Sequence, residues 1–350
     1  MRYKAPMAAR AGPSPTLTVA VTGPTGEIGQ SVVAALERSR EVARVRGMAR
    51  RAFDPRAHGW RKVTYRRGDV LDERAVADIV EGADVVIHLA FIIMGSASES
   101  RKVNLDGSRT VFEAAVAAGV KRLVYASSVA AYGFHRDNPQ PLTEDVPARG
   151  TDSHYYSAQK AEAEQLLRRT LEGSATEAYV FRPCIVAGPL APLLIDSLPY
   201  TQISERLPGP VLSLLEGVPV LKPVLPDPGV PFQLVHHDDV ASAMRAAALG
   251  RGQPGVYNLA GPGQLTVRAF AEELGWYSIP VPELAVDVVA QMIGRLAFLP
   301  AQAQWISAFR EPVIMDTSKA RRELRWRPAN DALQTLRQTI TASRLERLIR

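Results

Sequence analysis

Short runs rich in β-branched residues alternate with longer helical patterns through the first half of this chain. The runs that read as strands are 17–22, 43–49, 62–69, 83–90, 121–128 and 178–183. The helical patterns between them lie near 27–38, 73–80, 102–118 and 153–172. Parallel strands need long crossover connections, usually helices, so this alternation predicts βαβ units. The expected fold class is therefore α/β, with a doubly wound parallel sheet.

A glycine-rich turn follows the first strand and opens the first helix. It reads Thr-Gly-Pro-Thr-Gly-Glu-Ile-Gly over residues 22–29. Gly23 allows a tight turn, Gly26 allows a pyrophosphate to approach the backbone, and Gly29 allows the helix to pack on the sheet. The N–H groups and partial positive charge of a helix amino terminus favour a phosphate there. The turn predicts a dinucleotide site, and an ordinary strand–turn–helix connection is the alternative.

The end of the second strand bears on which dinucleotide binds. NAD sites place an acid there to hold the ribose hydroxyls, whereas NADP sites use a basic residue. The chain has no acid at this point but has Arg50 and Arg51, which could pair with a 2′-phosphate. We therefore expect NADP. NAD stays open as the cofactor, because surface arginines are often only solvated.

Tyr156 and Lys160 lie one turn apart in the predicted helix 153–172, so both face the same way. A neighbouring ammonium favours the phenolate and lowers the pKa of a phenol, which makes a tyrosine usable as an acid or base. Ser127 and Ser128 end a predicted strand, at the edge where parallel sheets carry their sites. Either hydroxyl could hold a substrate oxygen beside the phenol.

In this order, these motifs resemble those of the extended short-chain dehydrogenase/reductase superfamily, over residues 17–345. This NAD(P)-dependent epimerase/dehydratase-like branch includes sugar-nucleotide epimerases and dehydratases, 3β-hydroxysteroid dehydrogenases and dihydroflavonol-type reductases. The other matching segments are 68–72, 88–90, 103–108, 125–133 and 182–189. The resemblance implies a Rossmann fold with a smaller carboxyl-terminal substrate lobe.

The resemblance also implies a role for each matching residue. Tyr156 would exchange a proton with the substrate oxygen, Ser128 would hydrogen-bond that oxygen, and Lys160 would hold the nicotinamide ribose. Asn104 would brace the active-site helix and a proton-relay water. The residues expected to contact the cofactor, besides Arg50 and Arg51, are Gly23, Thr25, Gly26, Glu27, Ile28, Gly29, Asp69, Val70, Leu89, Ala90, Tyr156, Lys160, Pro183 and Ile185.

Departures from the family pattern bear on the reaction. Val129 and Ala130 stand where dehydratases of this type carry two acids, which disfavours dehydration. Phe232 stands where sugar-nucleotide enzymes carry an arginine for the diphosphate, although Arg206 or Arg310 could compensate. An apolar ring cannot pair with a diphosphate, so a nucleotide-sugar substrate loses one anchor.

The segment 189–231 is rich in proline and leucine and lies where the family builds its substrate lid. Its prolines argue against regular sheet, and its leucines suit either an apolar pocket or the core of the second lobe. We therefore expect an NADP(H)-preferring oxidoreductase that transfers hydride between nicotinamide and a carbonyl or secondary alcohol of a relatively apolar small molecule. The alternatives are a nucleotide-sugar 4-epimerase with tightly bound NAD and a cofactor-sensing protein without catalysis.

A chain of 350 residues exceeds what one hydrophobic core usually supports, so two lobes are expected. The predicted divisions are a disordered tail at 1–16, a cofactor domain at 17–185 with 233–262 adding to its sheet, and a substrate lobe at 186–232 and 263–350. The net charge of +6 comes with no nucleic-acid recognition motif, so no specific nucleic-acid partner is expected. The resemblance leaves a homodimer open.

A single cysteine, Cys184, excludes a disulfide framework and favours a reducing, cytoplasmic location. Residues 1–16 lack the apolar core of a signal peptide. Residues 285–301 are too polar for a membrane span and read as a packed helix, so no membrane partner is expected. His236 and His237 read as packing or capping groups, and no metal is expected.

Overall fold

The computed structural model describes residues 16–93, 97–196, 198, 222–281 and 311–349. The predicted tail at 1–16, except for its last residue, and the predicted helix at 285–301 lie outside the described residues. So do Arg206 and Arg310. Within the described ranges, no helix is both long enough and apolar enough to cross a lipid bilayer.

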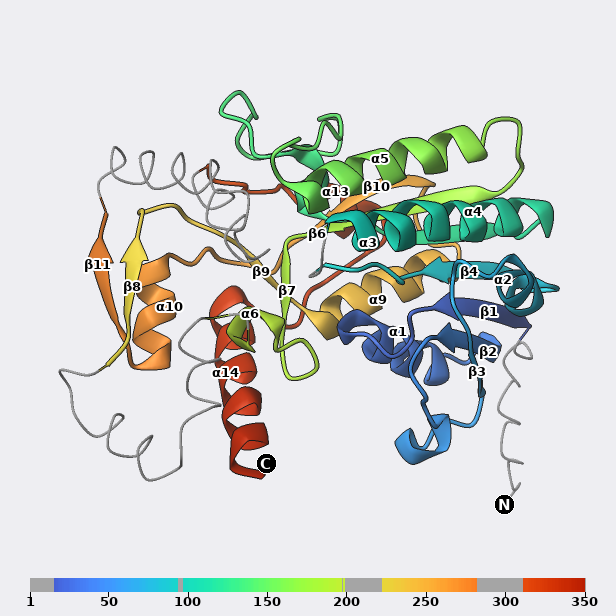
Figure 1. Ribbon diagram of the computed structural model, residues 1–350, viewed down its shortest axis with the longest axis horizontal. Coiled ribbons are helices and arrows are strands. Elements are labelled where there is room, and N and C mark those ends of the chain that lie inside the picture. The colour runs from blue at the N-terminus through green and yellow to red at the C-terminus, as the bar shows by residue number, and fades with distance from the viewer. Residues whose placement is uncertain (1–15, 94–96, 197, 199–221, 282–310, 350) are drawn as a thin grey trace, which may run out of the picture.

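A seven-stranded parallel sheet forms the centre of the molecule (Figure 1). Its strands, in spatial order, are β10 (Gly255–Leu259), β6 (Glu177–Pro183), β5 (Arg122–Ala126), β4 (Val85–His88), β1 (Leu17–Thr22), β2 (Val42–Ala49) and β3 (Val63–Arg67). The strand order runs outward in both directions from β1 and β4. In such sheets, ligands bind at the carboxyl ends of the strands near this reversal. The expected doubly wound α/β class is confirmed.

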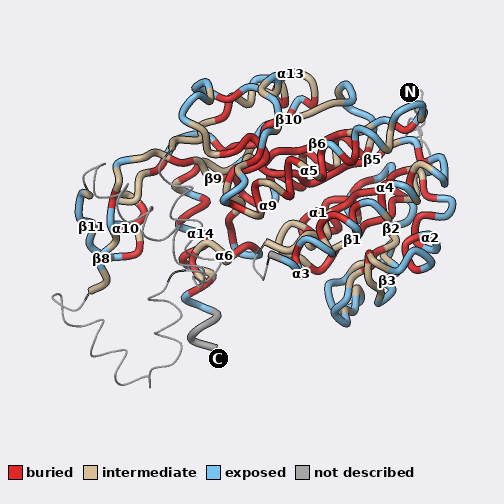
Figure 2. Tube along the Cα trace, turned by 45° about the horizontal axis from the view of Figure 1, so that its top comes forward, coloured by how far each residue is buried: buried red, intermediate tan, exposed pale blue. Residues whose placement is uncertain are grey.

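Helices cover both faces of the sheet (Figure 1). One face carries α1 (Glu27–Glu37) and α9 (His237–Ala248). The other carries α2 (Glu73–Val80), α4 (Gly107–Ala117) and α5 (Tyr155–Thr170). Successive strand residues point to opposite faces, so Val19 and Val21 of β1 join the first core and Ala20 joins the second. Figure 2 shows that both layers are buried where they meet the sheet.

Shorter helical turns lie at the ends of these elements. They are the 3₁₀ turns Pro55–His58 and Val129–Tyr132, helix α3 (Ala97–Arg101) and a π-helical turn at Lys102–Asp106. The helix predicted over 102–118 therefore begins with this π-helical turn and continues as α4. Such turns occur often at functional sites, and this one contains Asn104.

A smaller lobe packs around a separate core at one end of the sheet (Figure 1). Its elements are α6 (Leu193–Asp196), α10 (Val267–Leu274), α14 (Ala332–Ile349) and a two-stranded sheet of β8 (Val224–Asp227) and β11 (Tyr277–Pro280). A second two-stranded sheet joins β7 (Ile185–Ala187) to β9 (Leu234–His236), and α13 (Ser318–Glu323) packs near β10.

One sequence expectation is wrong in detail, and another, that residues 233–262 add to the sheet, is met by β10. The proline-rich segment 189–231 does contain a strand, β8, which includes Pro226. Proline is tolerated there because each strand of a two-stranded sheet has a free edge that needs no N–H donor. The strand expected at 233–235 is present as β9, but it pairs with β7 outside the central sheet. Of the segment 233–262, only β10 joins the seven strands.

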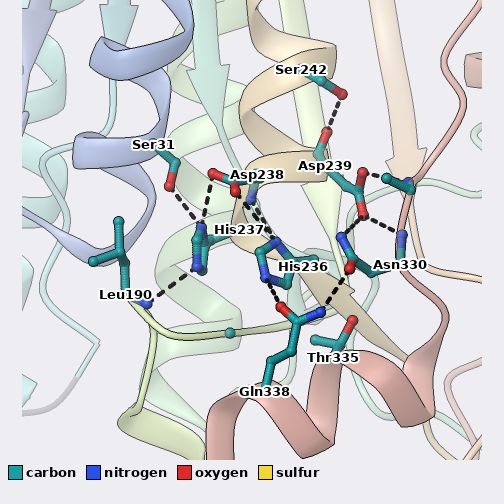
Figure 3. Close-up of polar contacts among 12 residues, drawn as sticks. Ser31, Leu190, His236, His237, Asp238, Asp239, Ser242, Asn330, Thr335 and Gln338 are labelled. Atoms are coloured by element: carbon teal, nitrogen blue, oxygen red, sulfur yellow. Dashed lines mark hydrogen bonds and ion pairs between the residues drawn. The ribbon is translucent and has the colours of Figure 1, made fainter. Parts of the chain in front are cut away.

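Asp239 on α9 ties the chain segment before α14 to the main body (Figure 3). Its Oδ1 accepts a hydrogen bond from Ala329 N at 2.7 Å, and its Oδ2 accepts from Asn330 N at 3.2 Å. The Asn330 Nδ2 donates to the same Oδ2 at 3.2 Å. The Trp326 Nε1 donates to the Asp239 carbonyl oxygen at 2.8 Å. The Asp239 side chain is buried, so its carboxylate oxygens depend on the Ala329 and Asn330 donors rather than on water.

Replacing Asp239 by alanine leaves Ala329 N and the two Asn330 donors without this acceptor, while Trp326 keeps its bond to the backbone carbonyl. We expect Asp239→Ala to lower the free energy of unfolding by at least about 2 kcal/mol, measured by urea denaturation. Ser242→Ala is the matched control on the same helix, because Ser242 only donates to the Asp239 carbonyl, at 2.7 Å. That variant should lose less than about 1 kcal/mol. Equal losses in the two variants would contradict the role of the carboxylate.

Candidate active site

The carboxyl ends of four neighbouring strands carry the residues predicted for the site. β6, β5, β4 and β1 lie side by side in this order. Pro183 ends β6, the pair Ser127 and Ser128 follows β5, Leu89 comes directly after β4, and Gly23 comes directly after β1. Since parallel strands end at one edge, residues from distant parts of the sequence meet there.

The glycine turn is held by direct backbone contacts. Gly23 has φ +76°, and its N–H donates to Met48 O at 2.9 Å. A Cβ on Gly23 would lie 2.8 Å from Ala90 N, and a Cβ on Gly29 would lie 2.1 Å from the Gly23 carbonyl oxygen. Neither position has room for a side chain. The turn therefore needs glycine at both ends, as expected for a phosphate-binding loop.

The amino terminus of α1 fits an anionic cofactor group. Its capping residue is Gly26, which is extended and forms no side-chain cap. A Cβ at Gly26 would contact only the Gly23 carbonyl oxygen, at 3.5 Å, so the space beside the loop is open. The N–H groups at the start of a helix have no helical acceptor. Together with the helix dipole, they could hold a diphosphate here.

The Glu27 side chain turns from this loop toward the smaller lobe. Its Oε1 accepts a hydrogen bond from Leu193 N, at the start of α6, at 3.1 Å. Burial raises the pKa of the Glu27 carboxyl, and the nearby Asp196 adds to this effect. The backbone of Glu27 thus lies in the predicted phosphate loop, while its carboxyl joins the loop to the lobe.

Tyr65 and Arg67, two residues of β3, support the turn that carries Arg50 and Arg51. The Arg51 Nη2 donates to the carbonyl oxygen of Thr25 in the glycine loop, at 2.6 Å. The Arg67 Nε donates to the Arg50 carbonyl oxygen at 2.9 Å. The Tyr65 hydroxyl donates to backbone carbonyls of the same turn. Sequence reasoning missed Arg67 and Tyr65, because only the pairing of β2 with β3 places them beside the arginines.

Asp69 and Val70, predicted to lie near the adenine, follow β3 at the same sheet edge. The Asp69 Oδ1 accepts a hydrogen bond from Leu71 N at 3.1 Å, which shapes a tight turn. Val70 is buried against the start of α4, where a Cβ on Gly107 would lie 2.5 Å from Val70 Cγ2. The structure thus places this segment close to the turn after β2.

The start of α5 brings Tyr156 to Ser128. His154 caps the helix by accepting from Ser157 N at 3.2 Å. The Ser157 hydroxyl donates to Ala130 O at 2.6 Å, which binds the helix to the turn that follows Ser128. The side chains of Tyr156 and Ser128 are hydrogen-bonded to each other. The family resemblance therefore selected, in Ser128 and Tyr156, two residues that are in contact.

Lys160 lies one turn beyond Tyr156 and is buried. Its Nζ donates to Ala126 O, at the end of β5, at 2.6 Å. Burial raises the pKa of Tyr156 to about 12 and lowers that of Lys160 to about 7. The sequence argument expected the ammonium to lower the phenol pKa, but here burial raises that pKa and the opposing effect comes from the Ser128 hydroxyl. Tyr156 is therefore protonated at neutral pH.

Asn104 braces the site through Ile92 and Gln159. Among the described residues, its hydrogen bonds do not include Tyr156 or Ser128. Its Oδ1 accepts from Ile92 N at 2.7 Å, and its Nδ2 donates to Ile92 O at 2.9 Å. The same Nδ2 donates to the Gln159 Oε1 at 2.8 Å, which joins it to α5. The implied bracing of the active-site helix fits these bonds. The implied relay through water remains a prediction.

A buried ion pair that sequence reasoning missed lies on α5 one turn beyond Lys160, where Glu164 meets Arg182 of β6. The Glu164 carboxylate accepts from Arg182 Nε at 2.9 Å and from Arg182 Nη2 at 2.5 Å. The Ser127 hydroxyl also donates to Glu164, at 2.5 Å. Although burial alone would lower the pKa of Arg182, Glu164 raises it. The pair joins α5, β5 and β6, and its signal in the sequence is Glu164 one turn after Lys160.

His236 caps helix α9 (Figure 3). Its Nδ1 accepts from Asp238 N at 3.1 Å, and its Nε2 lies 3.1 Å from the Gln338 Oε1. Since Nδ1 accepts, Nε2 carries the proton and donates to the glutamine. Burial lowers the pKa of His236, which keeps the ring neutral.

His237 connects α1 to the chain that leads into α6 (Figure 3). Its Nε2 accepts from Leu190 N at 3.2 Å, so the proton is on Nδ1, which lies 2.7 Å from the Ser31 Oγ and 3.2 Å from the Asp238 Oδ1. The ligand atoms of His236, His237 and Asp238 lie within 4.8 Å of one another. All four ring nitrogens already have partners, so the histidines cap and brace.

Phe232 lies inside the smaller lobe. It is buried, pairs with Leu265 through backbone bonds of 2.8 Å and 2.9 Å, and packs edge to face on Phe270. Ile195 is buried in the same core, and Leu194 packs against it. These apolar residues of the lobe therefore form its own core, which was one of the two readings of the leucine-rich segment.

The Glu27 carboxyl generates a prediction on cofactor affinity. Glu27→Gln keeps an acceptor for Leu193 N but removes the negative charge of the first residue of α1, the helix whose amino terminus is expected to meet the diphosphate. We expect the Kd of NADH and of NADPH to fall roughly tenfold, measured by fluorescence titration. Glu27→Ala is the control, because it removes the same charge and also the hydrogen bond from Leu193 N. Comparing the two variants separates the effect of the charge from the effect of that hydrogen bond. Weaker binding by Glu27→Gln would place the diphosphate elsewhere.

Comparisons with known proteins agree with this geometry. Residues 19–260 match the family model of the NAD dependent epimerase/dehydratase family. The 3 beta-hydroxysteroid dehydrogenase type 7 of Mus musculus is 35% identical over 173 residues, 44% of this chain and 44% of that enzyme. The sterol demethylase protein B of Methylococcus capsulatus is 32% identical over 182 residues, 49% of this chain and 52% of that protein. The chain thus matches about half the length of these relatives.

A solved structure extends the likeness to nearly the whole chain. The short-chain dehydrogenase/reductase superfamily protein from Agrobacterium tumefaciens, determined with bound NAD, superposes with a TM-score of 0.69 at 22% identity. The superposition covers 95% of this chain and 98% of that one, and it shows a shared fold. The chain belongs to the NAD dependent epimerase/dehydratase family, whose model matches residues 19–260.

Proposed function

We propose that the enzyme is an NADP(H)-linked oxidoreductase that acts on a carbonyl or secondary alcohol of a relatively apolar small molecule. The observation that carries the proposal is the contact between Tyr156 and Ser128, with the buried Lys160 one turn away. A phenol and a hydroxyl at one point can both reach a single substrate oxygen. The glycine loop on the neighbouring strands provides the place for the cofactor.

The proton state of Tyr156 supports reduction at neutral pH. When bound, a reduced nicotinamide supplies a hydride to the carbonyl carbon. Tyr156 gives its phenolic proton to the carbonyl oxygen, Ser128 donates a hydrogen bond to that oxygen, and the carbonyl becomes a secondary alcohol. A pKa of about 12 keeps the proton on Tyr156 until the substrate accepts it. Oxidation follows the same path in reverse and needs the phenolate.

Two observations support an apolar substrate. Phe232, which replaces a diphosphate-binding arginine, is buried in the lobe and offers no charge to a nucleotide. The relatives named above carry steroid and sterol names. A steroid-like alcohol or ketone is therefore a suitable first substrate class to test.

The preference for NADP(H) is supported by three guanidinium groups around one turn. Arg51 reaches the glycine loop, and Arg67 holds the backbone of Arg50. Guanidinium groups bind phosphate through charge-assisted, bidentate hydrogen bonds. A 2′-phosphate at the ribose would lie at this end of the predicted cofactor site.

Tyr156→Phe tests the catalytic assignment. Loss of the transferable proton should lower kcat by about 10²-fold to 10⁴-fold, while the Kd of the cofactor stays within about twofold of wild type. Turnover is followed at the nicotinamide absorbance with ketones, aldehydes, alcohols and nucleotide sugars. A fully active phenylalanine variant would refute the role of Tyr156. Tightly copurifying NAD with no net absorbance change would favour the 4-epimerase instead.

Arg51→Ala tests the cofactor preference. Removing a charged hydrogen bond to the 2′-phosphate should raise the Kd of NADPH by about tenfold to 100-fold and leave that of NADH nearly unchanged. Arg44→Ala, at an exposed position on β2, is a control for the loss of one positive charge. Tighter binding of NADH than of NADPH by the wild-type enzyme would refute the preference.

A further inference from the structure

Phe91 lies directly against both members of the catalytic pair. It is the third residue after β4, and its ring centroid is 3.5 Å from the Lys160 Nζ. The same ring meets the Tyr156 ring edge to face, at 5.7 Å between centroids and 88° between planes. Tyr125 contributes a second aromatic ring, with its centroid 5.1 Å from Nζ. The sequence motifs did not single out Phe91.

The Lys160 ammonium has few other groups to stabilise its charge. Its Nζ donates to the neutral Ala126 carbonyl, and the ion pairs of the described residues include none to Lys160. Glu164 acts on it from a distance, because that carboxylate is paired with Arg182. The face of an aromatic ring attracts a cation, most strongly when water is excluded. The ring of Phe91 is therefore a main partner of this charge.

The backbone that carries Phe91 is fixed by its neighbours. The Asn104 amide bonds to both the N–H and the carbonyl of Ile92, at 2.7 Å and 2.9 Å. The Tyr155 hydroxyl donates to Ile93 O at 2.8 Å. Because Asn104 also bonds to Gln159, this loop is tied to α5 on two sides. The loop and the catalytic helix therefore form one unit around Lys160.

We propose that Phe91 is a positioning residue for the reaction, whose ring holds the Lys160 ammonium and the Tyr156 ring in place and shields the ammonium from water. This inference rests on the proposed function, because it takes Lys160 to bind the nicotinamide ribose. A charged amine is a stronger donor to the ribose hydroxyls than a neutral one. The residue thus acts on cofactor binding through the charge of Lys160.

Phe91→Leu tests the proposal, because leucine keeps an apolar contact but has no aromatic face. The Kd of NADH is measured by fluorescence between about pH 5.5 and about pH 9, which brackets the Lys160 pKa of about 7. NADH is used because a 2′-phosphate titrates in this range itself, near a pKa of about 6.

Three titratable groups that face Lys160, namely His88, Tyr125 and Tyr156, keep one form over this range. The pKa of His88 on β4 is about 3, and that of Tyr156 is about 12. Burial raises the pKa of Tyr125 on β5 well above its ordinary value. On α5, Glu164 stays paired with Arg182 of β6, and Tyr155 keeps its bond to the loop. Glu27 and the other groups of the cofactor site are the same in all variants.

In the wild-type enzyme, NADH should bind less tightly above the pH at which Lys160 loses its proton. In Phe91→Leu the Lys160 ammonium stays shielded from water but loses the aromatic face, so its pKa falls. The midpoint of the pH dependence of NADH binding should therefore move down by about one pH unit. Phe91→Met, which also lacks an aromatic face, should show the same shift and serves if the leucine variant is unstable. Phe91→Tyr keeps a ring and should keep the wild-type midpoint.

Two outcomes overturn the proposal. One is a wild-type midpoint in folded Phe91→Leu and Phe91→Met, with folding checked by a thermal melt. The other is the same pH dependence in Lys160→Met, which would show that the titrating group is not Lys160. Failure of the proposed function looks different, because the wild-type enzyme would then transfer no hydride to any tested carbonyl while its NADH midpoint stays near the Lys160 pKa.

Discussion

Backbone-to-backbone contact at the carboxyl edge of the sheet is the constraint on which the site depends. Gly29 lies so close to Gly23 that a Cβ would be 2.1 Å from the Gly23 carbonyl oxygen, and Gly23 meets the backbone of Ala90 in turn. These contacts bring β1, helix α1 and the loop after β4 together without side chains between them. For this reason, the open amino terminus of α1 and the loop after β4 are neighbours.

Burial then sets the chemistry of the groups at this edge. Burial disfavours the charged form of both side chains. It therefore raises the pKa of Tyr156 and lowers the pKa of Lys160. The Glu164 and Arg182 pair stays charged in the same region, since its two ions satisfy each other through a bidentate contact. The Tyr156 phenol therefore keeps its proton at neutral pH, one helical turn from a lysine whose charge depends on its immediate contacts.

Much of the fold and part of the site follow from local sequence patterns. Strand and helix periodicity predicted six of the seven central strands and the helices α1, α2, α4 and α5. The helix spacing and the family resemblance together selected Tyr156 and Ser128, which are adjacent in the structure. The prolines of 189–231 misled, since Pro226 sits in a strand with a free edge. Arg67 and Glu164 were missed, because each is near its functional neighbour only through strand pairing or an ion pair between elements.

The sequence by itself determined the α/β class, the glycine turn before α1 and the choice of Tyr156 and Lys160 as candidate catalytic residues, because these depend on residue type and on spacing within one helix or one turn. The tertiary structure alone decided which strands lie side by side, the burial that sets the proton states of Tyr156 and Lys160, and the placement of Phe91 on the ammonium. These depend on contacts between residues far apart in the chain, which no local pattern records.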